Sequence, residues 1–110
     1  IGLSRWPTKD VLSVVPKAAI EALMTGLARE EGRNGVRANS VQLGIIEAGI
    51  FLRIKDTEYD EKYIEAAKNN TALKRLGTAE DVSDTVIFLS SNRASYVTGQ
   101  TIYLDGGFRI

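Results

Sequence analysis

The sequence predicts an α/β fold in which two parallel strands are joined by helices. Long stretches carry apolar residues at helical spacing, two short segments have the composition of strands, and helical segments separate those strands. The predicted order is helix, strand, helix, helix, strand. Strands joined by helical crossovers run parallel in one sheet. A chain of 110 residues is long enough for one small domain.

The first predicted helix follows a loop over residues 1–12 and begins near Ser13, whose hydroxyl can cap the first turn. Pro16 would then occupy the third helical position, where its missing N–H needs no partner. Glycine is common just past the end of a helix, and Gly32 holds that place.

Two strands are predicted, over Val36–Gln42 and Gly99–Leu104, and the stretch Leu43–Leu52 between them reads as a loop. A two-stranded parallel sheet is a poor independent fold, because parallel sheets are covered on both faces. We therefore expect residues 1–110 to be the C-terminal part of a doubly wound parallel sheet, with further strands contributed from an absent N-terminal half.

Two more helices are predicted between the strands. The first covers Thr57–Asn70 and is opened by a capping box from its first residue to Asp60. The second covers Ala79–Ser90, where Thr78 and Asp81 stand at capping-box spacing and apolar residues form one stripe. Both should pack on the sheet.

Composition excludes several kinds of site. The sequence has no cysteine and no histidine, so disulfides, thiolate metal sites and the commonest metal ligand are absent, and we expect no metal. Fourteen basic and fourteen acidic residues give a formal net charge of zero, which offers no electrostatic reason to expect nucleic acid. No apolar run approaches the ~20 residues of a membrane span. No signal peptide is evident, so we expect a cytoplasmic protein without a membrane partner.

The sequence resembles the C-terminal half of classical short-chain dehydrogenases/reductases, especially the acyl-carrier-protein ketoreductase-like branch. The resemblance extends from about Ser13 to Phe108 and implies one Rossmann-like domain that binds NAD or NADP. Four motifs occur in the family's order and spacing: Lys17-Ala18-Ala19, Val36-Arg37-x-Asn39, Arg75-Leu76-Gly77-Thr78 and Tyr96-Val97-Thr98-Gly99-Gln100.

The resemblance assigns catalytic roles to the start of the first helix. In the family, a Tyr is the general acid/base, and a Lys four residues later lowers the pKa of that Tyr and holds the nicotinamide ribose. Lys17 matches this Lys, but Ser13 stands where the Tyr is expected, and a spacing of seven found in some relatives reaches Asp10. A serine hydroxyl cannot replace a phenol with comparable efficiency. The alternatives are helix-cap or loop roles for Ser13 and Asp10, and a solvated surface role for Lys17.

The resemblance also places a nicotinamide-binding loop after the first strand. Family members usually read Pro-Gly-x-Ile-x-Thr there, and this sequence has Gly44 and Ile46 at the matching places. Leu43 replaces the Pro and Ala48 replaces the Thr. Main-chain contacts to the carboxamide are therefore expected at these four residues, without the threonine hydroxyl. A role as a simple connection is the alternative.

Tyr59 and Tyr63 fall where the family has a lid over the substrate, and packing of their helix against the core is the alternative. The family also forms subunit contacts through the segments Ala79–Ser90 and Gly99–Leu104, which implies a homo-oligomer. The implied activity is an NAD(P)-dependent, 3-oxoacyl reductase-like oxidoreduction of a small carbonyl or alcohol substrate, with the 110-residue chain inactive by itself. The alternative is a non-catalytic member that acts in nucleotide binding or subunit assembly.

Overall fold

A computed structural model describes residues 2–3 and 7–110, with the side chains of 55–58 excepted. β1 and β2 pair in parallel, with Ser40 opposite Thr101, as predicted. The elements in chain order are α1 (Val11–Glu31), η1 (Gly32–Asn34), β1 (Ser40–Leu43), α2 (Ile50–Glu58), α3 (Glu61–Asn69), α4 (Ala79–Ser90), η2 (Asn92–Ala94) and β2 (Thr101–Leu104).

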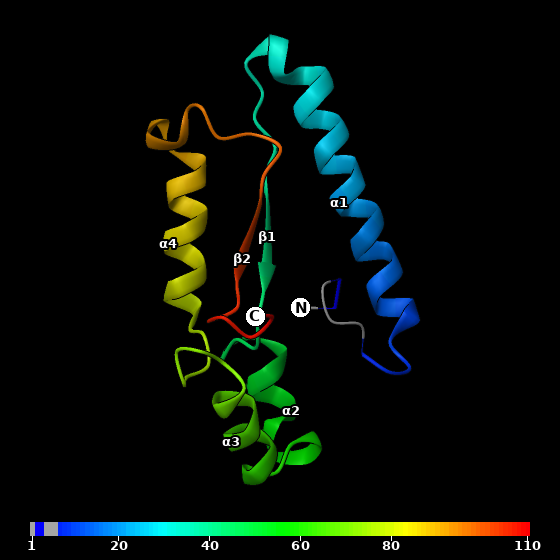
Figure 1. Cartoon of the computed structure of the whole chain (residues 1–110), viewed down its shortest axis with the longest axis vertical. Coiled ribbons are helices and arrows are strands. Elements are labelled where there is room, and N and C mark those ends of the chain that lie inside the picture. The colour runs from blue at the N-terminus through cyan, green and yellow to red at the C-terminus, as the bar shows by residue number, and fades with distance from the viewer. Residues whose placement is uncertain (1, 4–6) are drawn as a thin grey trace.

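The two strands lie between two helices (Figure 1). α1 lies on one side of the sheet and α4 on the other, while α2 and α3 lie beyond the carboxyl ends of both strands. This α/β/α layering confirms the predicted fold class. Ligands of such folds bind outside the carboxyl ends of the strands, which is where α2 and α3 approach the sheet.

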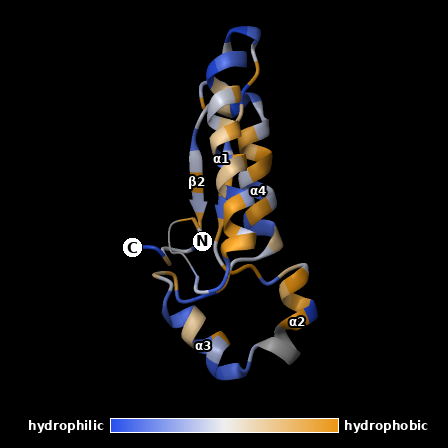
Figure 2. Ribbon diagram, turned by 90° about the vertical axis from the view of Figure 1, so that its right-hand side faces the viewer, coloured by the Kyte–Doolittle hydropathy of each residue, from blue (hydrophilic) through white to orange (hydrophobic). Residues whose placement is uncertain are grey.

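Few apolar side chains are buried within this chain. Hydrophobic residues run along both α1 and α4 (Figure 2). On α1, however, Leu12 is 89% exposed and Leu23 is 55% exposed, so much of that helix is uncovered. The buried apolar residues of the described chain are small or scattered: Val14, Ala28, Ala67, Leu76, Leu89 and Ala94.

α1 and η1 together meet the length and composition of a membrane span. Over Val11–Asn34 the best 18-residue window has a mean hydropathy of 1.5. The expectation that no apolar run approaches that length is therefore wrong. The core helix of a soluble α/β domain meets the same test, so composition does not distinguish the two environments.

α1 begins earlier than predicted. It starts at Val11, because the backbone carbonyl of Asp10 accepts the amides of Ser13 at 3.1 Å and Val14 at 2.9 Å. Ser13 is therefore inside the first turn and is not the N-cap. Pro16 lies at the sixth helical position, not the third.

The segment between α1 and β1 also differs from the prediction. α1 ends at Glu31 with Gly32 as its C-cap, as predicted, but Gly32 keeps a helical φ of −56° and the left-handed residue is Gly35 at φ 77°. The strand begins only at Ser40, because the residues just before it hydrogen-bond to the segment that precedes β2 and not to a strand. Arg37 donates from its guanidinium to the carbonyls of Val97 at 3.1 Å and Ser91 at 3.3 Å. β2 likewise begins two residues later than predicted.

The structure has two helices, α2 and α3, where one was predicted over Thr57–Asn70. Asp60 caps α3 by accepting the Tyr63 amide at 2.7 Å, so the predicted capping box that starts at Thr57 is wrong. Thr57 lies near the end of α2, which begins directly after Gly49 inside the stretch predicted as loop. Tyr59 and Asp60 lie between the two helices.

α4 has the predicted bounds and the predicted capping box. The Asp81 amide donates to the Thr78 hydroxyl at 3.2 Å, and the Thr78 amide donates to the Asp81 carboxylate at 2.8 Å. Arg75 adds two hydrogen bonds to the same carboxylate, at 2.6 and 3.0 Å. These bonds from Arg75, and then from Thr78, hold the pKa of Asp81 well below its usual range.

Candidate active site

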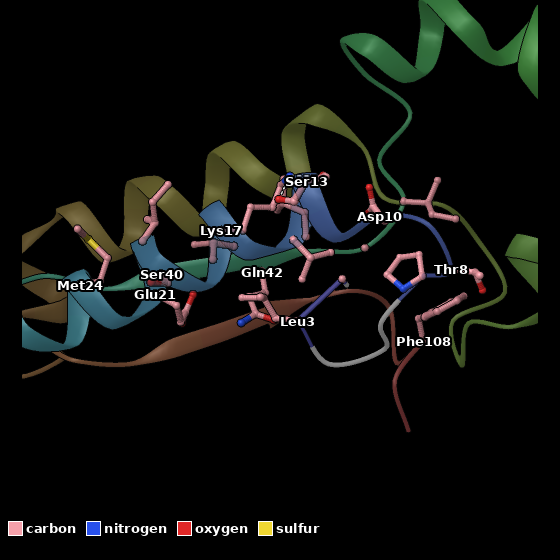
Figure 3. Close-up of a pocket in the computed structure, with 18 of the residues that line it drawn as sticks. Leu3, Thr8, Asp10, Ser13, Lys17, Glu21, Met24, Ser40, Gln42 and Phe108 are labelled. Atoms are coloured by element: carbon pink, nitrogen blue, oxygen red, sulfur yellow. Dashed lines mark hydrogen bonds between the residues drawn. The ribbon is translucent and has the colours of Figure 1, made fainter.

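A cavity of about 880 Å³ lies between α1 and the sheet (Figure 3). It is also lined by residues of the N-terminal segment, of the loop after β1, and of α3. The cavity brings together five residues singled out from the sequence for catalysis, cofactor binding or the lid: Ser13, Lys17, Leu43, Gly44 and Tyr63. Asp10 lines it as well.

Lys17 and Ser13 form a hydrogen-bonded pair on α1. The Lys17 ammonium donates to the Ser13 hydroxyl at 2.7 Å and to the Ser13 carbonyl at 3.0 Å. An ammonium has three N–H donors, so one is left for a ligand. Because the Ser13 oxygen accepts from Lys17, its own O–H can donate elsewhere. The pair therefore offers two donors to an oxygen atom in the cavity.

Gly44 follows β1 and carries the chain out of the sheet. Its amide donates to the Leu104 carbonyl at 2.8 Å. A Cβ at Gly44 would lie 2.7 Å from the Asp105 Cα, which is closer than real Cβ contacts. The close approach of the chain after β1 to the chain after β2 therefore requires glycine here. The glycine therefore has a structural cause beside its expected cofactor role.

The peptide group between Gly44 and Ile45 is available to a ligand. Its N–H and C=O make no backbone hydrogen bond within the described part of the chain, and both residues line the cavity. By contrast, Ile46 pairs with Gly77, and the Ala48 amide donates to the Ile46 carbonyl at 2.8 Å. Neither Ile46 nor Ala48 lines the cavity.

Three aromatic rings stack beside the cavity. Phe51 and Tyr59 have ring centroids 5.9 Å apart, and Tyr59 and Tyr63 have centroids 4.5 Å apart. Tyr63 lines the cavity and Tyr59 does not. Burial, and then the neighbouring Tyr59, raise the pKa of Tyr63 above its usual value, so its phenol stays protonated at neutral pH.

The structure adds two polar residues that the sequence interpretation left out. Glu21, one turn after Lys17, lines the cavity and accepts a hydrogen bond from the Thr101 hydroxyl of β2. Gln42 lines it from β1, and its buried Oε1 has no partner in the described part of the chain. The four-residue spacing from Lys17 was a signal for Glu21. Strand alternation puts Gln42 on the same face of β1 as Ser40 but does not show which face meets α1.

Metal-ligating residues do not gather in this site. Among the described side chains, which exclude those of 55–58, no group of three or more Asp and Glu is arranged to hold a metal ion. The site therefore offers hydrogen-bond donors, one ammonium and aromatic rings.

Comparison with known proteins covers nearly the whole chain. A family model described as enoyl-(acyl carrier protein) reductase matches residues 2–109. The chain belongs to the short-chain dehydrogenase/reductase family. A solved short-chain dehydrogenase/reductase from Mycobacterium ulcerans superposes with a TM-score of 0.89 at 34% identity, over 99% of this chain and 38% of that one. This similarity confirms the Rossmann-like fold inferred from the sequence motifs.

Curated members of the family show the same partial overlap. The 3-oxoacyl-[acyl-carrier-protein] reductase FabG of Buchnera aphidicola is 36% identical over 91 residues, which are 83% of this chain and 35% of that protein. The L-rhamnose 1-dehydrogenase (NAD(P)(+)) of a Sphingomonas species is 38% identical over 94 residues, which are 86% of this chain and 36% of that protein. The chain therefore spans about a third of the length of the curated relatives it matches.

Proposed function

We propose that the protein carrying this chain is an NAD(P)-dependent oxidoreductase that interconverts a carbonyl and an alcohol. The observation that carries the proposal is the cavity shared by the Lys17–Ser13 pair and the free peptide group at Gly44–Ile45. The names of the two relatives support it, since one reduces a 3-oxoacyl group and the other is an NAD(P)+-linked sugar dehydrogenase. They support either dinucleotide as cofactor.

The residues present fit the nicotinamide end of such a cofactor. Lys17 would hold the ribose, and the peptide group at Gly44–Ile45 offers a donor and an acceptor for the carboxamide. The three-glycine phosphate-binding fingerprint of dinucleotide folds does not occur in the 110 residues. When bound, the nicotinamide supplies or accepts the hydride at the substrate carbon. In the reducing direction, a carbonyl, NAD(P)H and one proton give an alcohol and NAD(P)+.

The chain's own contribution is to the substrate oxygen. As the carbonyl carbon gains a hydride, negative charge develops on the oxygen and must be stabilised by fixed donors. The Ser13 hydroxyl can donate to that oxygen, and the positive charge of the adjacent Lys17 ammonium stabilises it. Because a serine hydroxyl is a weak acid, we propose that solvent supplies the proton that completes the alcohol. Turnover should therefore be slow.

The test measures NAD(P)H oxidation by the whole protein over a panel of ketones and aldehydes. Lys17→Met should lower kcat/KM by about 100-fold, because the ribose loses its donor and the developing oxyanion loses the adjacent positive charge. The matched control is Lys62→Met, an exposed lysine on α3 that does not line the cavity, and it should change kcat/KM less than twofold. Equal activity of the two variants contradicts the proposal.

A second candidate function is nucleotide binding or assembly without turnover, and the serine at position 13 favours it. Ser13→Tyr separates the two functions in the same assay. If the protein with Ser13 turns over a carbonyl slowly and Ser13→Tyr accelerates it, the enzyme proposal stands. If only the tyrosine variant has activity, the second candidate replaces it. Under either function, we propose that the 110-residue chain alone is inactive.

A further inference from the structure

The three-ring stack has a free end inside the cavity. Phe51 lies on α2, Tyr59 between the two helices, and Tyr63 on α3. Successive ring planes differ by only 19° and 15°, so all three rings face the same direction. Among the described residues, Tyr59 has two ring neighbours and Tyr63 has one. Within that part of the chain, the stack therefore ends at Tyr63.

The last ring is accessible. Tyr63 is 45% exposed, although Tyr59 covers one of its faces. It is the one tyrosine among the described residues that line the cavity. Aromatic rings prefer offset-stacked neighbours at centroid distances of about 4.5–7 Å, and each such pair adds about 0.5–1.5 kcal/mol beyond area burial. A flat group in the cavity can thus extend the stack as a fourth ring.

The same cavity holds the groups that would act on a carbonyl. Gly44 and Ile45 line it at the end of β1, and Lys17 and Ser13 supply donors from α1. Further apolar side chains line the space, among them Val14, Ile20 and Met24. A substrate suited to this cavity carries a carbonyl near the Lys17–Ser13 pair and an apolar, planar group toward α3.

We infer that Tyr63 selects carbonyl substrates that bear an aromatic or other flat conjugated group. The inference rests on the proposed oxidoreductase function and names the substrate class of that site. An extended acyl chain, which is flexible and saturated, gains burial from the cavity but no stacking with Tyr63.

The experiment compares two ketones of similar size, acetophenone and cyclohexyl methyl ketone, which differ in the flatness of the ring. In the whole protein, kcat/KM should favour acetophenone. Tyr63→Leu should lower kcat/KM for acetophenone by about 3- to 10-fold, as the loss of one stacked pair predicts, and change the other ketone less than twofold. Tyr63→Phe should retain the preference, because it keeps the ring. Tyr96→Leu, at an exposed tyrosine that does not line the cavity, is the matched control.

A binding measurement keeps this inference separate from the proposed function. Ligand-observed NMR should show acetophenone bound to the protein with its ring protons shifted upfield, and Tyr63→Leu should remove that shift. If no carbonyl is turned over while this binding persists, the oxidoreductase proposal fails and the aromatic site stands. Equal binding of the two ketones overturns the inference. So does a Tyr63→Leu variant that loses affinity for the dinucleotide and leaves the ketone preference unchanged.

Discussion

At the scale of single residues, the position of Lys17 changes the argument for its function. A cation in the first turn of a helix opposes the helix dipole, and a helix that begins near Ser13 would place Lys17 in that turn. Because α1 begins at Val11, Lys17 is the seventh helical residue, beyond the turn where that effect is felt. The evidence for its role now comes from the Ser13 contact and from the cavity that both residues line.

Asp81 supplies a prediction about pH. Its folded-state pKa is depressed below the ordinary 3.8 by Arg75, so the carboxylate stabilises the fold wherever it is ionised in both states. Below about pH 4 the Asp81 carboxyl is protonated in the unfolded chain but still ionised in the folded chain. The contribution of Asp81 to the free energy of unfolding is therefore lost as the pH falls further. Asp81→Asn should therefore be destabilising at pH 7, with a difference from wild type that shrinks below pH 4.

Urea unfolding of the whole protein, followed by circular dichroism at pH 7, 4 and 3, measures this difference. Asp84→Asn changes an exposed carboxylate on the same helix that makes no ion pair within the described residues, so it is the control and should be nearly neutral at each pH. A gap between wild type and Asp81→Asn that stays constant down to pH 3 would show that the Arg75 pair does not set the pKa of Asp81.

At the scale of elements, a polar link from Glu21 to Thr101 ties α1 to the sheet. Within the described residues, the only side-chain hydrogen bond between α1 and a strand joins Glu21 to the Thr101 hydroxyl of β2. Thr101→Val removes the donor and leaves the part-buried carboxylate without it, which should cost about 2 kcal/mol. Urea unfolding should report that loss, and hydrogen exchange should accelerate at the α1 amides near Glu21.

Two variants calibrate this link. Thr101→Ser retains the hydroxyl and should stay within about 0.5 kcal/mol of wild type. Thr25→Val makes the same chemical change on α1 itself, where the hydroxyl donates to the Glu21 carbonyl at an exposed position, and should have a comparably small effect. If Thr101→Val and Thr101→Ser behave alike, the link to Glu21 does not hold the helix.

Sequence reasoning worked best for elements whose ends are determined locally. α4 has its predicted bounds because Thr78 and Asp81 cap it within four residues. The start of β1 was predicted four residues too early, at Val36, because Arg37 binds carbonyls that are 60 and 54 positions away in the sequence. The family motif singled out Lys17, Ser13 and Gly44, and the structure shows that all three line one cavity. Gln42 was missed, because its importance depends on which strand face meets α1, and that is a tertiary fact.

At the scale of the whole molecule, α1 and α4 both carry apolar side chains that are exposed to solvent in this chain. On α1, the exposed apolar residues outside the cavity include Leu12 and Leu23. The curated relatives are about three times as long as this chain, and we propose that the rest of the whole protein covers these residues. On α4, Val86, Ile87 and Phe88 are exposed on the opposite side of the sheet. β2 also has one strand edge unpaired among the described residues.

We propose that α4 and β2 form the contact between copies of the whole protein, and Ile87 provides the test. Its side chain is 65% exposed on α4. In a twofold-symmetric interface each substitution acts twice, and burying an isoleucine is worth about 1.5–3 kcal/mol, so Ile87→Lys should weaken association by at least about 100-fold. Analytical ultracentrifugation of the whole protein measures the shift toward monomer.

Ile110→Lys, at an exposed residue that belongs to neither α4 nor β2, is the control and should leave the assembly intact. An Ile87→Lys protein that keeps the wild-type assembly would move the interface away from α4, and the apolar face of α1 would be the next to examine.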